Sequence, residues 1–558
     1  MKLKHTNHFR PVLYAIFVLL VVFACQKINP FEDVELTVNT DIYKSPILLR
    51  FVDGNPDATK VPEGLTVTIS GPDKDLVLND AGGKDYTVAG NVLPLVLNKN
   101  VSPSQTKPIN FTVAVSGTGY VSTSKTITVV SADSSLSFEI PLTSVNNPPH
   151  GAAAATKVLS LTAGETITVP ATADKVETAQ ITIAPGTQVK DAAGNVINAT
   201  TVKAQVVQYG TQNEEALRSF PGGFSPQNVA TQNGTNTNGE FITAGFVAVD
   251  MEADGKKVTG FSKPIDIKVG VSAELDNPET GQKVREGDKI PTWSYESETG
   301  GWKEEGEAVV TKGSDGKLVA SFKASHLSYW NIDWFYGLSF NRICATSFKL
   351  RVSSNITGYV NSYDYYTKMY IVQSNGTRIF RGNLYYFSPV NGAANPFGGN
   401  VPSGYRMQFE VYRYGDNAKI GGTDIFNPCG ITQVPVTITA PSPPVYLDID
   451  MDFTARCSNK NVNIKPSIWV IFYDITAGRW SWTYAISGKA NIKLREGREH
   501  IFYTYYGGKA YSGNVTFGKN SSNIATSGGG TGISGTITYN NSTGKVNILA
   551  SYIGNNCK

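Results

Sequence analysis

Apolar and polar residues alternate one by one along most of this chain. The alternation is clear at residues 65–69 (LTVTI), 111–115 (FTVAV) and 265–269 (IDIKV). A period of two puts every second side chain on one face of an extended strand, whereas an amphipathic helix needs an apolar stripe that repeats about every 3.6 residues. Turn signals such as Asp-Gly at 53–54 and Asn-Gly at 375–376 separate the runs, and helical stripes are nearly absent. The sequence therefore predicts an all-β protein.

The chain is too long for a single β-sandwich. It has 558 residues, whereas one domain usually has roughly 100 to 200. Composition breaks at residues 146–149, 336–341 and 441–444 mark linkers, and the prolines in the first and last of these stiffen the chain. We therefore predict tandem β-sandwich domains of immunoglobulin-like type. Their expected spans are residues 34–145, 156–336, 341–440 and 445–558.

The first residues have the layout of an export signal. A basic stretch without acids precedes an uncharged apolar run at residues 12–24, which ends directly before Cys25. That run is shorter than the about 20 apolar residues that cross a bilayer comfortably. The sequence thus predicts a cleaved signal rather than a spanning helix.

The context of Cys25 resembles the lipobox of bacterial lipoproteins, in which the cysteine sulfur is diacylated and the cysteine becomes the new N-terminus. The resemblance implies a lipoprotein signal peptide at residues 1–24 and a short tether at residues 25–33. It also implies an exported protein held by membrane lipid, with the outer membrane, on its periplasmic or cell-surface side, as the expected location. An ordinary cleaved signal with a coincidental cysteine is the alternative.

Two stretches resemble known extracellular modules. Residues 61–69 (VPEGLTVTI), 84–87 (KDYT) and 125–129 (KTITV) look like the small prealbumin-like or carboxypeptidase-regulatory-like sandwiches. The second expected domain resembles a β-rich module of cartilage intermediate layer protein, a structural or adhesive module, so that resemblance implies no catalytic residues. The segments that carry it are residues 183–187 (IAPGT), 191–194 (DAAG), 243–251 (TAGFVAVDM), 291–295 (PTWSY), 299–306 (TGGWKEEG) and 326–330 (HLSYW).

The charge balance argues against a nucleic-acid partner. Removal of Lys2, Lys4 and Arg10 with the signal leaves 46 basic and 46 acidic residues. A neutral chain lacks the clustered lysines and arginines that bind phosphate polymers. We therefore expect no nucleic-acid binding.

The cysteines other than Cys25 lie in the last two expected domains. An even number in an exported chain favours disulfides, and three pairings are possible. We favour Cys344 with Cys429 and Cys457 with Cys557, because each pair brackets one expected domain. A metal site is less favoured, because the short C-x-x-C spacing is missing.

Three aspartates, Asp448, Asp450 and Asp452, alternate with apolar residues and so share one face of a predicted strand. Close carboxylates could hold Ca²⁺, but calcium takes 6 to 8 oxygen ligands, usually from a loop that curls round the ion. We favour the solvated face of an edge strand, where charges discourage edge-to-edge pairing. We expect no metal and no cofactor.

Aromatic residues also gather on one strand face. Trp480, Trp482 and Tyr484 occupy alternate positions. Such a flat face could stack on sugar rings, but the interior of a β-sandwich shows the same pattern. Both interpretations stay open.

Catalytic signals are sparse. His326 lies near Ser325 and Ser328, but the chain has no G-x-S-x-G elbow, and a histidine that packs at a strand end explains the pattern more simply. Glu304 and Glu305 are expected to face solvent. The sequence predicts a non-enzymatic lipoprotein with a binding, adhesive or structural role toward an extracellular protein or glycan. A carbohydrate-binding accessory protein and a hydrolase with an unrecognised site are the alternatives.

Overall fold

A computed structural model shows the architecture of the chain. Strands make up most of its described part, where the single α-helix is the short α2 (Glu214–Arg218). The all-β prediction is therefore confirmed. No helix among these residues is long and apolar enough to span a membrane. The described residues are 36–39, 43–80, 82–88, 91–132, 136–313, 315–337, 343–358, 360, 362–384, 387–402, 404–414, 417–439, 445–457, 462–477, 479–506, 509–520, 522–525 and 533–554.

The first unit (β2 to β8) is a sandwich of two sheets, ordered β4-β5-β2-β8 and β3-β6-β7. The alternating apolar side chains of both sheets, such as Leu49, Leu95 and Phe111, meet in one buried cluster. This is how a period-2 pattern forms a core between two sheets. Its elements are β2 (Lys44–Asp53), β3 (Leu65–Ser70), η1 (Lys74–Leu76), β4 (Val77–Asn79), β5 (Val92–Leu97), β6 (Ile109–Gly117), β7 (Tyr120–Val129) and β8 (Leu136–Leu142).

The central unit (β9 to β25) is built on one large curled sheet, ordered β10-β11-β19-β24-β23-β22-β25-β17-β14-β9. The two end strands, β9 and β10, lie against each other, so the sheet folds round its own core. Phe241 lies in that core, and the centre of its ring is 4.6 Å from that of Trp302 and 5.2 Å from that of Trp293. The strands are β9 (Ala152–Ser160), β10 (Glu165–Val169), β11 (Ala179–Ile183), β12 (Val189–Lys190), β13 (Val196–Ile197), β14 (Thr201–Tyr209), β15 (Val229–Ala230), β16 (Asn236–Thr237), β17 (Gly239–Ala253), β18 (Lys256–Lys257), β19 (Gly260–Val271), β20 (Asp276–Asn277), β21 (Gln282–Lys283), β22 (Lys289–Glu296), β23 (Gly301–Lys312), β24 (Leu318–His326) and β25 (Tyr329–Gly337).

The third unit (β26 to β32) is a seven-stranded sheet ordered β28-β27-β30-β31-β32-β26-β29. Phe348 of β26 and Phe409 of β30 lie 6.1 Å apart, although two strands separate them within the sheet, so this sheet also curls over a core. A disulfide joins Cys344 and Cys429, as predicted. The elements are β26 (Ile343–Ser354), η2 (Ser362–Asp364), β27 (Tyr365–Val372), β28 (Arg378–Leu384), β29 (Ala394–Pro402), β30 (Arg406–Arg413), β31 (Ala418–Gly422) and β32 (Gln433–Ile438).

The fourth unit (β33 to β42) is again a sandwich, with a larger sheet that contains β34-β33-β42-β41-β40 and a smaller one ordered β36-β35-β38-β39. Ile449 of the larger sheet and Phe472 of the smaller one lie in the shared core. The strands are β33 (Tyr446–Cys457), β34 (Val462–Lys465), β35 (Ile468–Asp474), β36 (Arg479–Ala485), β37 (Lys489–Arg495), β38 (Glu499–Tyr506), β39 (Lys509–Thr516), β40 (Ser522–Ala525), β41 (Ile533–Asn540) and β42 (Lys545–Gly554).

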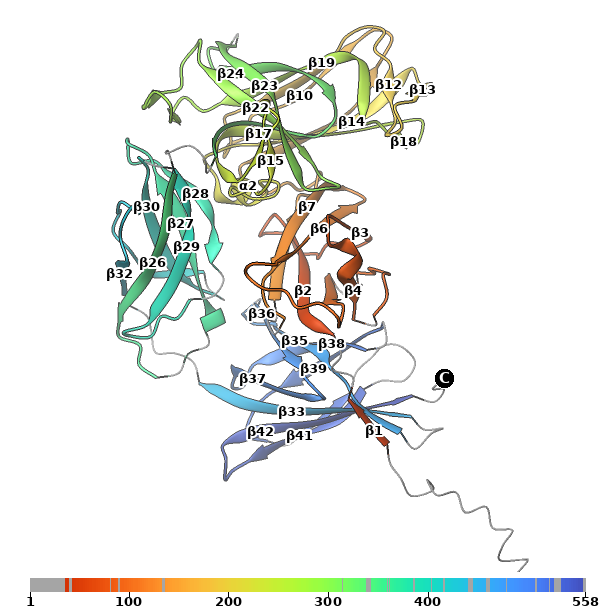
Figure 1. Cartoon of the computed structure of the whole chain (residues 1–558), viewed down its shortest axis with the longest axis vertical. Coiled ribbons are helices and arrows are strands. Elements are labelled where there is room, and N and C mark those ends of the chain that lie inside the picture. Colours follow the sequence, from red (N-terminus) through yellow and green to blue (C-terminus); the bar gives the residue numbers. More distant parts are fainter. Residues whose placement is uncertain are drawn as a thin grey trace, which may run out of the picture.

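Strand β1 (Leu36–Asn39) does not join the first unit, within whose expected span it lies. It pairs in parallel with β34, with Leu36 opposite Val462 and Asn39 opposite Lys465. The segment just after the predicted tether therefore completes an edge of the larger sheet of the fourth unit (Figure 1).

The four units contact one another in a closed cycle (Figure 1). Ser124 of the first unit bonds to Tyr295 of the central unit, and Arg381 of the third unit pairs with Glu240 of the central unit. Between the third and fourth units, Arg495 lies 3.5 Å from Asp364. The cycle closes where apolar side chains of the first and fourth units meet. They are Leu48, Val92, Trp469, Ile471 and Tyr505.

Candidate ligand-binding groove

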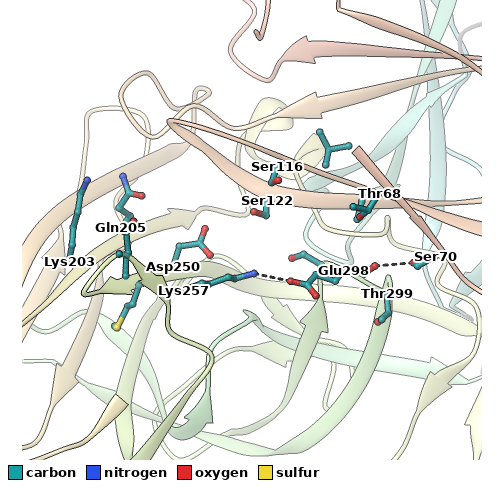
Figure 2. Close-up of a pocket in the computed structure, with 16 residues that line it drawn as sticks. Thr68, Ser70, Ser116, Ser122, Lys203, Gln205, Asp250, Lys257, Glu298 and Thr299 are labelled. Carbon is teal, nitrogen blue, oxygen red and sulfur yellow. Dashed lines mark hydrogen bonds and ion pairs between the residues drawn. The ribbon is translucent and has the colours of Figure 1, made fainter. Parts of the chain in front are cut away.

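A groove of about 740 Å³ lies between the first and central units (Figure 2). Its walls come from β3, β6 and β7 of the first unit, and from β14, β17 and the turn after β22 of the central unit. A second cavity of about 330 Å³ adjoins it along the central unit. Pockets of this size hold small ligands in other proteins. The residues common to both cavities are Ser122, Asp250, Lys257, Ser297 and Glu298.

Strand register sets the polar wall of the central unit. Gln205 of β14 lies opposite Asp250 of β17, and Lys203 lies opposite Glu252. Opposed residues of an antiparallel pair project from the same face, so these four side chains line the groove together. Met251, between Asp250 and Glu252 along β17, is buried below them.

The β17–β18 hairpin brings in a lysine. Its two turn residues, Asp254 and Gly255, have φ values of 47° and 68°, and a two-residue turn of this kind favours Asp-Gly because both positions need positive φ. Lys257 then lies opposite Glu252. Its ammonium group donates to the Glu298 carboxylate over 3.2 Å.

The two units touch at the turn after β22. Gly300 has a φ of 73°, and a Cβ added there would lie 2.9 Å from a methyl carbon of Thr112 in the first unit. Nearby, the Ser70 hydroxyl donates to the Glu298 carbonyl oxygen over 2.9 Å. A glycine at position 300 thus permits the close approach that fixes one end of the groove.

Asp250 is the most exceptional group in the groove. Burial raises the pKa of its carboxyl, and the charge of Lys257 only partly opposes that rise. The carboxylate makes no hydrogen bond to any other described residue, and Figure 2 shows it pointing into the space between the labelled side chains. A partly buried acceptor without a protein donor is suited to a ligand hydroxyl or amide.

His326 lies in the second cavity but does not form a catalytic pair with a serine. Its Nε2 is 3.2 Å from Glu305 Oε1, and its ring packs 4.9 Å from Trp330. The Ser328 hydroxyl donates to the backbone carbonyl of Tyr295 instead. A histidine that packs at a strand end fits this arrangement.

The expectation that Glu305 faces solvent is wrong, because its side chain is only 19% exposed. Burial raises the pKa of Glu305, but hydrogen bonds from His326, Lys303 and Ser294 outweigh that effect and lower it to about 2. Glu304 accepts the backbone N–H of Gln232 over 3.0 Å. Both carboxylates are held by bonds that the sequence spacing does not reveal.

The aromatic face of β36 lies between two units. Trp480, Trp482 and Tyr484 are partly buried and pack against the cluster that holds Leu48 of the first unit. The Arg50 guanidinium lies 5.7 Å from the Trp480 ring and 5.4 Å from the Trp482 ring, a cation–π arrangement. The three rings share one face, as the alternation predicts, but that face meets the first unit rather than the interior of its own sandwich.

The edge-strand interpretation of the aspartates is wrong, because β33 is an inner strand with β42 on one side and β34 and β37 on the other. Lys545 lies 2.9 Å from Asp450, and Lys465 lies 2.6 Å from Asp452. Asn491 donates to Asp448. No group of three potential metal ligands occurs in the part of the chain that the structure describes.

Two predicted cysteine sites fall outside the described residues. Cys457 is in a disulfide, but Cys557 lies beyond the described part, so its pairing with Cys457 stays a prediction. Cys25 also lies outside it, and its acylation is likewise a prediction.

One family model matches part of the chain. It is described as FAM171A1/A2/B, N-terminal, and it covers residues 182–333, which run from β11 to β25. The central unit is similar to this family. The FAM171 match spans less than half of the chain, so it does not place the whole protein in that family. The resemblance of the same region to cartilage intermediate layer protein stays a prediction.

No curated protein sequence matches the chain. Among solved structures, the pilus adhesin SpaC of Lactobacillus rhamnosus GG is 10% identical, with 72% of this chain and 57% of the adhesin covered and a TM-score of 0.14. The Bacillus anthracis TIE protein is also 10% identical, with 73% and 75% covered and a TM-score of 0.12. The match therefore spans little more than half of the adhesin, and scores this low carry no argument about function.

Proposed function

We propose that this chain is an exported, lipid-anchored and non-enzymatic binding protein that holds a polar ligand in the groove between its first and central units. Asp250 is the observation that carries this proposal, because its partly buried carboxylate faces the groove without a protein hydrogen-bond donor. The sequence around Cys25 supports the anchor.

The chemistry of the walls favours a glycan as the ligand. Each sugar hydroxyl both donates and accepts hydrogen bonds, and the groove offers hydroxyl, amide, ammonium and carboxylate groups from two separate units. Lys203 and Lys257 face three carboxylates, so a strongly anionic ligand is not favoured. The hydroxyl groups are those of Thr68, Ser70, Ser116, Ser122, Ser297 and Thr299.

Catalysis is not part of this proposal. A serine nucleophile needs a base within hydrogen-bond reach. Here the hydroxyl of Ser328 and the imidazole of His326 engage other partners. These two contacts support the proposal of a binding role, because neither group is free to act on the other.

Asp250→Asn is expected to weaken glycan binding about tenfold or more, because a hydrogen bond to a charged group contributes roughly 1.5 to 3 kcal/mol. The measurement is a glycan array followed by calorimetry on the best glycan. Asp424→Asn, at an exposed aspartate of the third unit, is the matched control and should bind like the wild type. The proposal that the groove binds a glycan would be contradicted if the wild type bound no glycan on the array. It would also be contradicted if Asp250→Asn left the affinity unchanged.

Cys25→Ala tests the anchor. The wild type, purified from its native membrane, is expected to partition into detergent and to carry acyl mass at Cys25. The variant is expected to lose both, because alanine has no sulfur to carry the acyl chains that would anchor the protein. Intact mass and detergent partitioning measure this directly. A soluble wild type without acyl mass would contradict the anchor and favour a freely secreted protein.

A further inference from the structure

The larger sheet of the fourth unit has one face against the core and one face outward. Residues of β33 alternate between the two, with Ile449 and Met451 buried and Arg456 exposed. Strand β42 lies beside it in parallel register, with Leu549 next to Asp452 and Ile553 next to Arg456. We call the outward side of these strands and of β37 the outer sheet face.

Two large apolar side chains project from the outer sheet face. Leu549 is 60% exposed and Ile553 is 46% exposed. They lie four residues apart on one strand, so both point the same way, about 13 Å apart. Single exposed apolar residues are common, so this pair indicates a binding surface only together with the charged residues around it.

The charges on the outer sheet face leave an excess of cations. Lys545 and Lys465 are paired with the aspartates of β33. Arg456 and Lys489 are exposed, and neither forms an ion pair with another described residue. Arg456 lies next to Ile553 on the neighbouring strand. Asp452 lies between Lys489 of β37 and Leu549 of β42. Apolar and cationic side chains are thus interleaved, as on proteins that rest on anionic lipid.

The path of the N-terminal segment brings the predicted anchor to the same sheet. Strand β1 is an edge strand of this sheet, paired with β34. Leu36 follows Cys25 by eleven residues. A fully extended chain spans at most about 3.6 Å per residue, so lipid attached at Cys25 stays within about 40 Å of this edge. The predicted anchor therefore attaches at an edge of the sheet that carries the outer sheet face and keeps this unit close to the bilayer.

We propose that the outer sheet face lies against an anionic phospholipid bilayer, with Leu549 and Ile553 among the headgroups and with Arg456 and Lys489 at the lipid phosphates. Its orientation rests on the proposed anchor at Cys25. The fourth and central units lie at opposite ends of the long axis of the molecule, with the first unit between them (Figure 1). This orientation turns the groove away from the membrane, toward ligands in the surrounding medium.

Vesicle co-sedimentation of the full chain with Cys25→Ser tests this surface without acylation. The Cys25→Ser chain is expected to bind vesicles of phosphatidylglycerol and to leave vesicles of phosphatidylcholine unbound. Each cation near an anionic surface contributes about a factor of five to binding, so Arg456→Glu with Lys489→Glu should reduce it more than tenfold. Leu549→Ser with Ile553→Ser should reduce it severalfold.

Matched variants on the central unit control for general effects of charge and polarity. Lys256→Glu with Lys312→Glu changes two exposed lysines, and Val309→Ser changes a side chain that is 43% exposed. Both controls should bind like the parent. The proposal is overturned if the parent does not bind phosphatidylglycerol, if the controls lose as much binding, or if the parent self-associates through this face instead.

The two proposals fail separately. If the native protein is acylated but the Cys25→Ser chain does not bind vesicles, the proposed anchor stands and the proposed membrane contact of the outer sheet face is wrong. If the Cys25→Ser chain binds vesicles but the native protein is not acylated, the membrane contact stands and the anchor is wrong.

Discussion

Replacing Arg381 with methionine is expected to loosen the junction of the central and third units by about 3 to 5 kcal/mol. Its guanidinium lies 2.7 Å from Glu240, and the two side chains are only 5% and 1% exposed. The same group donates to the backbone carbonyl of Phe241 and lies 4.4 Å from the centre of the Phe224 ring. Removing it leaves a buried carboxylate with only the Ser225 hydroxyl as a donor, and burial already raises the pKa of Glu240.

Hydrogen exchange of β17 and β28 measures this effect locally, which matters because a chain of several units does not unfold in two states. Arg381→Met with Glu240→Leu should recover much of the loss, since it removes the unpaired charge as well. Lys289→Met is the control, because its pair with Glu307 is 65% and 54% exposed and such a pair contributes at most about 1 kcal/mol. Equal exchange in the Arg381 and Lys289 variants would contradict the importance of the buried pair.

Removing the Cys344–Cys429 disulfide is expected to destabilise the third unit by about 4 to 5 kcal/mol. The two cysteines are 85 residues apart in sequence, so the bond restricts almost the whole unit when it is unfolded. In the chain-entropy account a loop of this length gives that magnitude. The bond joins the beginning of β26 to the segment between β31 and β32.

The double variant Cys344→Ser with Cys429→Ser should show faster hydrogen exchange in β26 to β32, and reduction of the wild type should produce the same change there. Treating the double variant with the same reductant controls for other disulfides, and it should alter the third unit no further. Unchanged exchange in the double variant would show that packing against the central unit, not the disulfide, holds this unit together. The shared apolar cluster of the two units makes that comparison informative.

The closed cycle of units gives the groove its second wall. The central unit alone supplies Asp250, Gln205 and Lys257, but the hydroxyl groups opposite them belong to the first unit. The first unit is held from its other end by the aromatic strand of the fourth unit, through the contacts of Arg50 and Leu48. Trp480 and Trp482 therefore support the position of a groove wall, even though a stacked sugar on them would have to displace the first unit.

Several features follow from the sequence alone. The period of two determines the strands, and it also determines which side chains share a face, as the aspartates of β33 and the rings of β36 show. The pairing of Cys344 with Cys429, one of three possible, was predictable because the two cysteines bracket one unit. These features are local, or they depend on sequence distance only.

What covers each face was decided by the tertiary structure. Alternation does not distinguish a face that meets its own core from one that meets another unit, because both exclude water in the same way. This is why the sequence leaves Trp480 ambiguous, why β33 proves to be an inner strand, and why β1 pairs with β34 some 420 positions later. The groove around Asp250 likewise depends on strand register and on contact between units. The alternation of polar and apolar residues predicts neither of these.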